Sequence, residues 1–242
     1  MANQFERAYE KLTQFLSPVS AARLDMMRPS RRMPWGGPMN GQDGRQAIVK
    51  ELLAAVPFAQ LVETGTFRGS TTEFLSIASA RPVVTVEAVP RNYEYARRRL
   101  KRFEDVRVVE GDSRRCLTEL ALSATELPVL FYLDAHWAED LPLEGELEII
   151  ENSWPKAVVL VDDFEVPDDP GYGFDNYGLG KSLDHGLLDR SAVAAWDRFA
   201  PVLPSAEETG ALRGCVVIAS PEMSAQVQGA SLLRRIGTQP LV

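Results

Sequence analysis

Val-Leu-Phe-Tyr-Leu-Asp at residues 129–134 and Ala-Val-Val-Leu-Val-Asp-Asp at residues 157–163 are the stretches that decide the fold. Each is a short apolar run that ends in an acid. Strands that are buried on both faces, as in a parallel sheet, have this composition and carry charges only where they emerge. We therefore expect the three aspartates, together with His136, to meet at one edge of a sheet, where open α/β sheets bind their ligands.

Helical and strand-like patterns alternate along the middle of the chain. After a helix at 45–56, the expected strands are 60–64, 83–87, 106–110, 129–134 and 157–162, and the helices between them are 70–79, 91–102, 113–121 and 142–152. This alternation predicts an α/β fold with a doubly wound, mostly parallel, Rossmann-like sheet of about seven strands. Helical spacing over 185–197 precedes two strand-like runs, 198–203 and 212–219, which predict a C-terminal antiparallel hairpin at the sheet edge.

The N-terminal part has a different pattern. Residues 4–28 place apolar side chains at helical spacing, interrupted by Pro18, and predict an N-terminal helical cap. Residues 29–44 are rich in Pro, Gly, Arg and Met and predict a lid loop. We divide the chain into this cap with its lid loop, 1–44, and an α/β domain, 45–242. The apolar helix and the sheet-edge hairpin would both suit a homodimer.

The composition narrows the classes of partner. With 242 residues, 45% of them hydrophobic, the chain can bury the core of one domain. Its formal net charge of −8 disfavours nucleic acid, because phosphate contacts need clustered Lys and Arg. Cys116 and Cys215 have neither the spacing of a disulfide framework nor that of metal ligands. The sequence shows no pattern of a leader peptide and no run of roughly 20 apolar residues that could span a membrane. We expect a cytoplasmic protein that contacts no membrane and acts on a small molecule.

A second set of polar residues follows the first three predicted strands. Glu63 ends the first strand and precedes Gly65 and Gly69, which let the backbone pass close to a ligand. Glu87 ends the second strand, where a carboxylate could accept hydrogen bonds from both hydroxyls of a ribose, and an Asp-Ser pair follows the third. The glycine spacing matches neither a dinucleotide fingerprint nor a P-loop, so a cofactor without phosphates fits better.

This succession resembles the S-adenosylmethionine (SAM) site of class I methyltransferases. The resemblance implies that 45–242 is a class I methyltransferase-like domain, with Glu63 and Gly65 near the amino-acid end of the cofactor and Glu87 on its ribose. The Asp-Ser pair would then lie near the adenine. The cofactor-binding residues it implies are Met39, Asn40, Glu63, Gly65, Thr66, Gly69, Ser70, Thr71, Glu87, Ala88, Asp112, Ser113 and Asp134.

Residues 133–137, Leu-Asp-Ala-His-Trp, and 161–163, Val-Asp-Asp, resemble the metal-binding segments of the catechol O-methyltransferase family. Metal-dependent macrolide-sugar O-methyltransferases are similar at the same two strand ends. The resemblance implies an O-methyltransferase in which Asp134, Asp162 and Asp163 bind Mg²⁺ or another divalent cation, as suits hard cations that prefer oxygen ligands. The cation would hold two neighbouring hydroxyls of a small diol, sugar or natural product and lower the pKa of one of them.

The chain also departs from the catechol enzymes. Ala135 is inserted before the His-Trp pair, and Ala138 stands where that family has a lysine general base. His136 is the best replacement because imidazole titrates near neutral pH, with Asp134 as the second catalytic residue and His185 as the second choice of base. The expected substrate-contacting residues are Trp137, Phe164, Tyr172 and Tyr177, with Trp35, Phe174, Asp175 and Asn176 as further candidates.

Two alternatives stay open. A metal-independent methyltransferase would use His136 as its base and keep the aspartates for structure, and activity unchanged by EDTA would select it. A non-catalytic SAM-binding or scaffold protein would bind the cofactor without turnover, since a fold alone does not fix a function.

Overall fold

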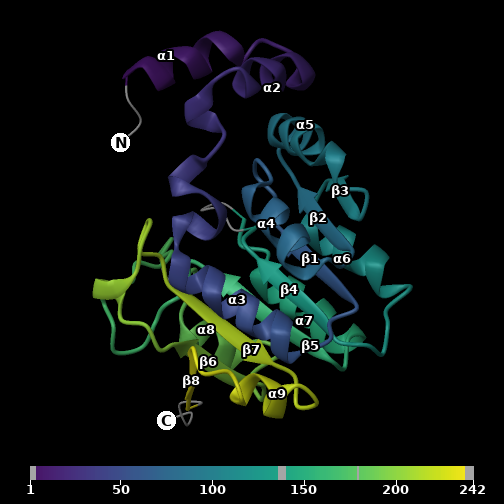
Figure 1. Ribbon diagram of the computed structural model, residues 1–242, viewed down its shortest axis with the longest axis vertical. Coiled ribbons are helices and arrows are strands. Elements are labelled where there is room, and N and C mark those ends of the chain that lie inside the picture. Colours follow the sequence, from purple (N-terminus) through teal and green to yellow (C-terminus); the bar gives the residue numbers. More distant parts are fainter. Residues whose placement is uncertain (1–3, 136–139, 179, 238–242) are drawn as a thin grey trace.

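The computed structural model describes residues 4–135, 140–178 and 180–237 (Figure 1). Within these residues the chain forms an eight-stranded sheet in the order β3-β2-β1-β4-β5-β7-β6-β8. The strands are β1 Gln60–Thr64, β2 Val83–Glu87, β3 Val106–Glu110, β4 Val129–Leu133, β5 Ala157–Asp162, β6 Asp197–Pro201, β7 Cys215–Ala219 and β8 Leu233–Ile236. The α/β fold expected from the sequence is confirmed.

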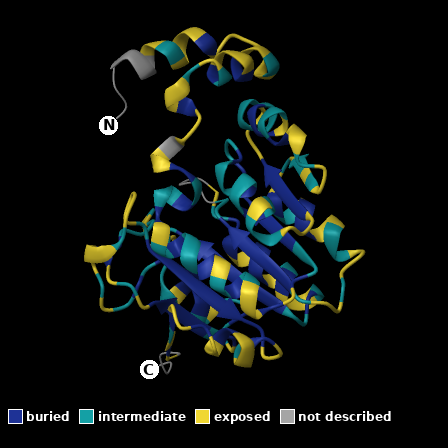
Figure 2. Ribbon diagram, in the orientation of Figure 1, coloured by how far each residue is buried: buried dark blue, intermediate teal, exposed yellow. Residues whose placement is uncertain are grey.

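Helices cover both faces of the sheet. They are α1 Gln4–Thr13, α2 Pro18–Met26, α3 Asp43–Ala55, α4 Ser70–Ser79, α5 Pro90–Arg99, α6 Ser113–Ala121, α7 Leu143–Ser153, α8 His185–Arg190 and α9 Ser224–Gln228, with short 3-10 turns η1 Pro29–Arg31, η2 Pro34–Gly36, η3 Pro38–Gly41, η4 Leu100–Arg102 and η5 Ser205–Glu207. One core lies between the sheet and α3, α4 and α9, and another lies between its opposite face and α6, α7 and α8. Figure 2 shows the buried strands between helices whose outer faces are exposed. None of the described helices is long and apolar enough to cross a membrane.

The strand order places the ligand-binding edge. β1 pairs in parallel with both β2 and β4, and β5 continues the parallel sheet beyond β4. The chain therefore winds in opposite directions on either side of β1 and β4, and the carboxyl ends of these two strands lie together. Such a reversal is the place where doubly wound sheets leave a crevice for ligands.

The C-terminal strands differ in part from the prediction. β6 and β7 pair antiparallel, as expected for the hairpin, but β7 lies between β5 and β6 and the sheet edge is β8. β8 escaped prediction because its sequence, Leu-Arg-Arg-Ile, has apolar residues only at its ends. The helix expected over 185–197 ends at Arg190, because the following residues form turns that bury Val193 and Trp196 in the core.

The N-terminal helices sit apart from the sheet. Figure 1 shows α1 and α2 above α5, and α2 packs against α5. Asp25 of α2 accepts hydrogen bonds from Arg91 of α5, 2.7 Å away, and from Tyr9 of α1, 2.9 Å away, so the expected helical cap is fixed to the sheet domain by a buried carboxylate. Leu12 and Phe15 are exposed, and a homodimer through this segment stays a prediction.

Candidate functional site

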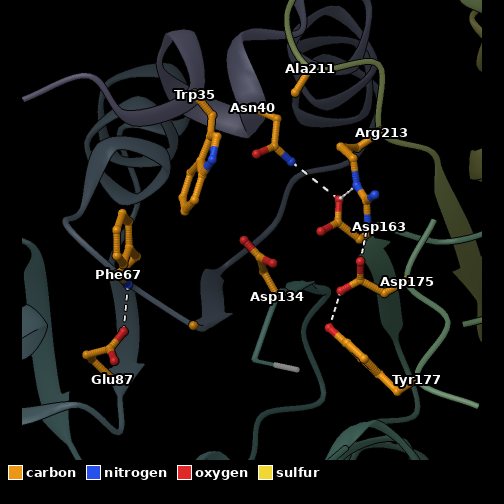
Figure 3. A pocket seen from close by; sticks show the side chains of 11 residues that line it. Trp35, Asn40, Phe67, Glu87, Asp134, Asp163, Asp175, Tyr177, Ala211 and Arg213 are labelled. Atoms are coloured by element: carbon orange, nitrogen blue, oxygen red, sulfur yellow. Dashed lines mark hydrogen bonds and ion pairs between the residues drawn. The ribbon is translucent and has the colours of Figure 1, made fainter. Parts of the chain in front are cut away.

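A cavity of about 390 Å³ lies at the carboxyl ends of the parallel strands (Figure 3). The strand ends contribute Gly65 after β1, Glu87 of β2, Asp134 after β4 and Asp163 after β5. Its volume is in the range of pockets that bind small molecules and cofactors. The sheet edge expected to carry the site is therefore hollow.

A smaller hollow of about 70 Å³ adjoins this cavity and shares Gly65 and Glu87 with it. It contains Ala88, Asp112 and Ser113, the residues expected at the adenine end of a cofactor. Asp112 accepts a hydrogen bond from the backbone N–H of Arg115, 3.2 Å away, and so also caps α6. The two hollows together form an elongated space that passes the Glu87 carboxylate.

A third hollow, of about 30 Å³, lies on the other side of Asp134 and contains Met39, Thr66, Ser70 and Thr71. It shares Asn40, Gly65 and Asp134 with the main cavity. The backbone N–H of Met39 donates to Thr71 Oγ1 at 3.0 Å, which fixes the η3 turn against the start of α4. All but two of the expected cofactor residues thus line these three connected spaces.

The two exceptions are Glu63 and Gly69. Glu63 is 1% exposed and accepts hydrogen bonds from the hydroxyls of Thr72 and Thr85 beneath the site. Burial raises the pKa of Glu63 to about 7, and these two hydrogen bonds oppose the increase. Gly69 caps α4 in the left-handed conformation and packs on Leu100. Both support the wall of the site from behind, and their contact with the cofactor stays a prediction.

Gly65 is required by the close approach of two strand ends. Its φ is +83°, and a Cβ at this position would lie 2.2 Å from the carbonyl oxygen of Asp134. The backbone N–H of Asp134 donates to the Thr64 carbonyl at 3.0 Å, which fixes the two chains side by side. A side chain at Gly65 would therefore push the end of β4 out of the site.

The backbone holds the Glu87 carboxylate in place. One oxygen accepts the N–H of Phe67 at 2.7 Å, and the other accepts the N–H of Val89 at 2.8 Å. Burial raises the pKa of Glu87, while the same two hydrogen bonds lower it. The Asn92 side chain donates to this carboxylate as well, and the remaining acceptor position can still take a ligand hydroxyl.

Strained backbone is concentrated around the cavity. Four of its non-glycine lining residues have positive φ, namely Trp35 at 49°, Asn40 at 59°, Phe67 at 48° and Asp163 at 53°. Such residues are uncommon, and they cluster at functional sites where the surrounding structure fixes them. The Trp35 and Phe67 rings lie 5.1 Å apart at one wall of the cavity.

The predicted metal ligands are only partly brought together. Asp134 and Asp163 line the cavity, whereas Asp162 is fully buried and forms an ion pair with Arg45. Asp162 also accepts hydrogen bonds from the Tyr132 hydroxyl at 2.5 Å and from the N–H of Asp163 at 2.7 Å. Within the described ranges no three His, Cys, Asp or Glu side chains form a metal-binding group. The described side chains at these strand ends therefore do not form a donor set that fits a divalent cation.

The carboxyl of Asp134 faces the cavity. Burial, followed by the negative charges of Asp163 and Glu63, raises its pKa well above the ordinary value. Carboxyls with raised pKa values are common where proteins transfer protons. Asp134 is therefore a candidate proton acceptor on geometric and electrostatic grounds.

The expected aromatic contacts divide into two groups. Tyr177 lines the cavity and donates to Asp175, which lines it too. Phe164 and Tyr172 are 0% and 3% exposed in the hydrophobic core and do not line the cavity, and their contact with substrate stays a prediction. The core holds them because the loop after β5 runs back beneath β7, whose neighbour Gly214 accepts the Phe164 N–H at 3.1 Å.

The two histidine predictions have different outcomes. His136 and Trp137 lie outside the described residues. His185 begins α8, and its ring meets the edge of the Phe164 ring at 5.3 Å. Burial lowers the pKa of His185, and its side chain does not line the cavity, so it is not placed to act as the base.

Sequence reasoning missed Phe67, Ala211 and Arg213, which also line the cavity. Arg213 comes just before β7, and β7 pairs antiparallel with β5 so that Cys215 lies opposite Asp162. This pairing brings the basic residue beside the acidic strand end. If the predicted strand 212–219 had been expected to pair with strand 157–162, Arg213 could have been predicted at the site.

The fold has close counterparts among solved structures, although no protein-family model and no curated protein sequence matches the chain. A putative caffeoyl-CoA O-methyltransferase from Staphylococcus aureus is 15% identical, with a TM-score of 0.55 over 90% of this chain and 100% of that one. An O-methyltransferase from Bacillus cereus in complex with SAH is 16% identical, with a TM-score of 0.54 over 88% of this chain and 97% of that one. The chain has the methyltransferase fold.

The O-methyltransferase TomG from Streptomyces achromogenes, involved in tomaymycin synthesis and solved in complex with SAM, has this methyltransferase fold as well. It is 19% identical, with a TM-score of 0.52 over 91% of this chain and 100% of that one. At these identities the likeness establishes the architecture, as the motifs at the strand ends predicted. Function has to be argued from the site itself.

Proposed function

We propose that the protein is a SAM-dependent O-methyltransferase that acts on a hydroxyl of a small molecule. The observation that carries the proposal is the Glu87 carboxylate, which faces the cavity at the strand reversal and is held by two backbone N–H groups. It stands beside Gly65, which lines all three hollows at the end of β1. Solved O-methyltransferases of the same fold with SAM or SAH bound support this reading.

The connected spaces divide naturally between two ligands. Glu87 would accept a hydrogen bond from a ribose hydroxyl, and the hollow with Asp112 and Ser113 would take the adenine. The part of the main cavity near Asp163 and Tyr177 would take the substrate. Asp134 lines both the main cavity and the third hollow, so it lies where these two spaces meet.

SAM, when bound, supplies an electrophilic methyl group on a sulfonium. Asp134 would accept the proton of the substrate hydroxyl as its oxygen attacks that methyl, and the raised pKa makes this carboxylate a stronger base once it is ionised. Fixing the hydroxyl in line with the methyl would contribute most of the acceleration. His136, the base expected from the sequence, stays a prediction.

We favour a metal-independent form of this reaction over the Mg²⁺ form that the sequence resemblance implied. The reason is the chemistry of the donors: Asp162 is bound by Arg45 and Tyr132, and Asp163 is bound by Arg213. Substrate hydroxyls would be positioned by these fixed side chains. The substrate class remains a hydroxylated small molecule.

The first test is isothermal titration of SAM and SAH into the purified protein and into Glu87→Ala. Loss of the hydrogen bond between this carboxylate and a ribose hydroxyl should weaken binding by roughly ten- to a hundredfold. Binding should be followed by transfer of labelled methyl groups to a panel of small hydroxylated compounds, with and without EDTA.

Glu110→Ala is the matched control for this titration. Glu110 occupies the same register position as Glu87 on the neighbouring strand, but it is exposed and lines none of the three spaces. Equal affinities of both variants and the wild type would contradict the proposed cofactor site. Tight binding without transfer to any compound would favour the non-catalytic alternative.

A further inference from the structure

Arg45 is a cation built into the core beside the candidate site. Its side chain is 1% exposed, and it extends from the first turn of α3 to the end of β5. One terminal nitrogen donates to Asp162, and the other donates to the carbonyl oxygens of Arg213 and Gly214. The guanidinium thus fills the place between the ends of β5 and β7.

Asp162 has no acceptor capacity left for a metal ion. A carboxylate offers about four lone-pair sites, two on each oxygen. Oδ1 accepts from Arg45 and from the N–H of Asp163, and Oδ2 accepts from the Tyr132 hydroxyl and from Asn40 at 3.5 Å. A cation at this carboxylate would have to displace the buried donors Arg45 and Tyr132.

Arg213 has the corresponding role at the cavity wall. Its Nε donates to Asp163 at 2.8 Å, and its Nη2 donates to Asp175. Figure 3 shows its guanidinium between these two carboxylates, with Tyr177 completing the row through Asp175. Burial lowers the pKa of Arg213, but its two carboxylate partners outweigh burial and raise it, so the charge is permanent.

We infer that Arg45 and Arg213 together take the place of a divalent cation at the ends of β4 and β5. Two guanidiniums carry the same charge of +2 as the metal ion that the acidic strand ends would suit. Arg45 pairs with Asp162, while Arg213 pairs with both Asp163 and Asp175 and fixes their orientation toward the substrate space. The protein therefore binds no catalytic metal at this edge, and Arg213 is a positioning residue.

A gain of metal binding follows from this arrangement. Without Arg213, the carboxylates of Asp134, Asp163 and Asp175 would line one cavity together, and Arg45 is not among the described residues that line it. Three carboxylates with water suit an octahedral hard cation. Arg213→Met keeps much of the side-chain volume and removes the charge, so we expect it to create a site that the wild type lacks.

The test is to titrate Mn²⁺ alone into three proteins and to measure the free ion by electron paramagnetic resonance. The proteins are the wild type, Arg213→Met and the double variant Arg213→Met with Asp163→Asn. We expect no stoichiometric binding to the wild type, one ion bound at least about tenfold more tightly by Arg213→Met, and loss of that ion in the double variant. Arg190→Met is the control, because Arg190 pairs with Glu144 on the surface away from the cavity.

Binding of one Mn²⁺ by the wild type that Asp163→Asn abolishes would overturn the inference. So would a folded Arg213→Met that binds no ion, because the guanidinium would then not be what occupies the position. If Arg213→Met does not fold, the wild-type titration decides alone. The catalytic meaning of the inference rests on the proposed function, but Mn²⁺ binding is measured without SAM or substrate, so the two can fail separately.

Discussion

Asp134 is the single side chain on which the proposed chemistry depends most. Asp134→Asn keeps its shape but cannot accept a proton, and we expect kcat to fall by roughly a hundred- to ten-thousandfold. Cofactor affinity should change much less, because Glu87 and the adenine hollow are untouched. Steady-state kinetics with the best hydroxylated substrate, together with SAM titration, separate the two effects.

Asp105→Asn provides the control for that measurement. Asp105 is exposed just before β3, at the opposite end of the strands from the cavity. It should leave both kcat and SAM affinity unchanged. If Asp134→Asn turns over within twofold of the wild type, Asp134 is not the general base. Another residue must then accept the proton, and His136 would be tested first.

At the scale of elements, the five parallel strands could be predicted because each is an apolar run between turn residues. The acidic residues at their ends then predicted the site, because parallel strands bring their carboxyl ends to one edge. Arg45 and Arg213 could not be predicted in this way. Arg45 reaches Asp162 from α3, and Arg213 reaches Asp163 because β7 enters the sheet next to β5; both are long-range contacts that leave no local pattern.

A substitution at Gly65 tests whether the close approach of the ends of β1 and β4 is needed for the stability of the fold. Gly65→Ala would place a Cβ 2.2 Å from the Asp134 carbonyl, at a φ of +83° that side chains rarely adopt. We expect a loss of more than about 2 kcal/mol, or a Tm lower by at least about 4 °C, measured by calorimetry.

Gly111→Ala separates the clash from the backbone strain. Gly111 also has positive φ, at +145°, but a Cβ there would meet no atom within 4 Å. Its Tm should therefore fall less than that of Gly65→Ala. Equal losses would show that conformation alone, and not the contact with Asp134, makes Gly65 necessary.

At the scale of the whole molecule, buried acids set the dependence of stability on pH. Burial raises the pKa of Glu63 and of Glu146 to about 7, from an ordinary value of 4.5. Between these values the unfolded chain loses protons that the folded protein keeps. The folded state binds more protons there, so the free energy of unfolding must fall as the pH rises from about 4.5 to about 7 and then level off.

Each of these groups contributes at most roughly 3 to 4 kcal/mol to that fall, at about 1.4 kcal/mol per pKa unit over the rise from 4.5 to about 7. Glu63→Gln cannot ionise, and its amide can still hydrogen-bond with Thr72 and Thr85. Urea denaturation at several pH values should therefore show the stability of the wild type declining relative to Glu63→Gln as the pH rises, whereas the exposed Glu126→Gln should follow the wild type. A constant difference between the wild type and Glu63→Gln across this range would mean that Glu63 ionises in the folded protein as easily as in water.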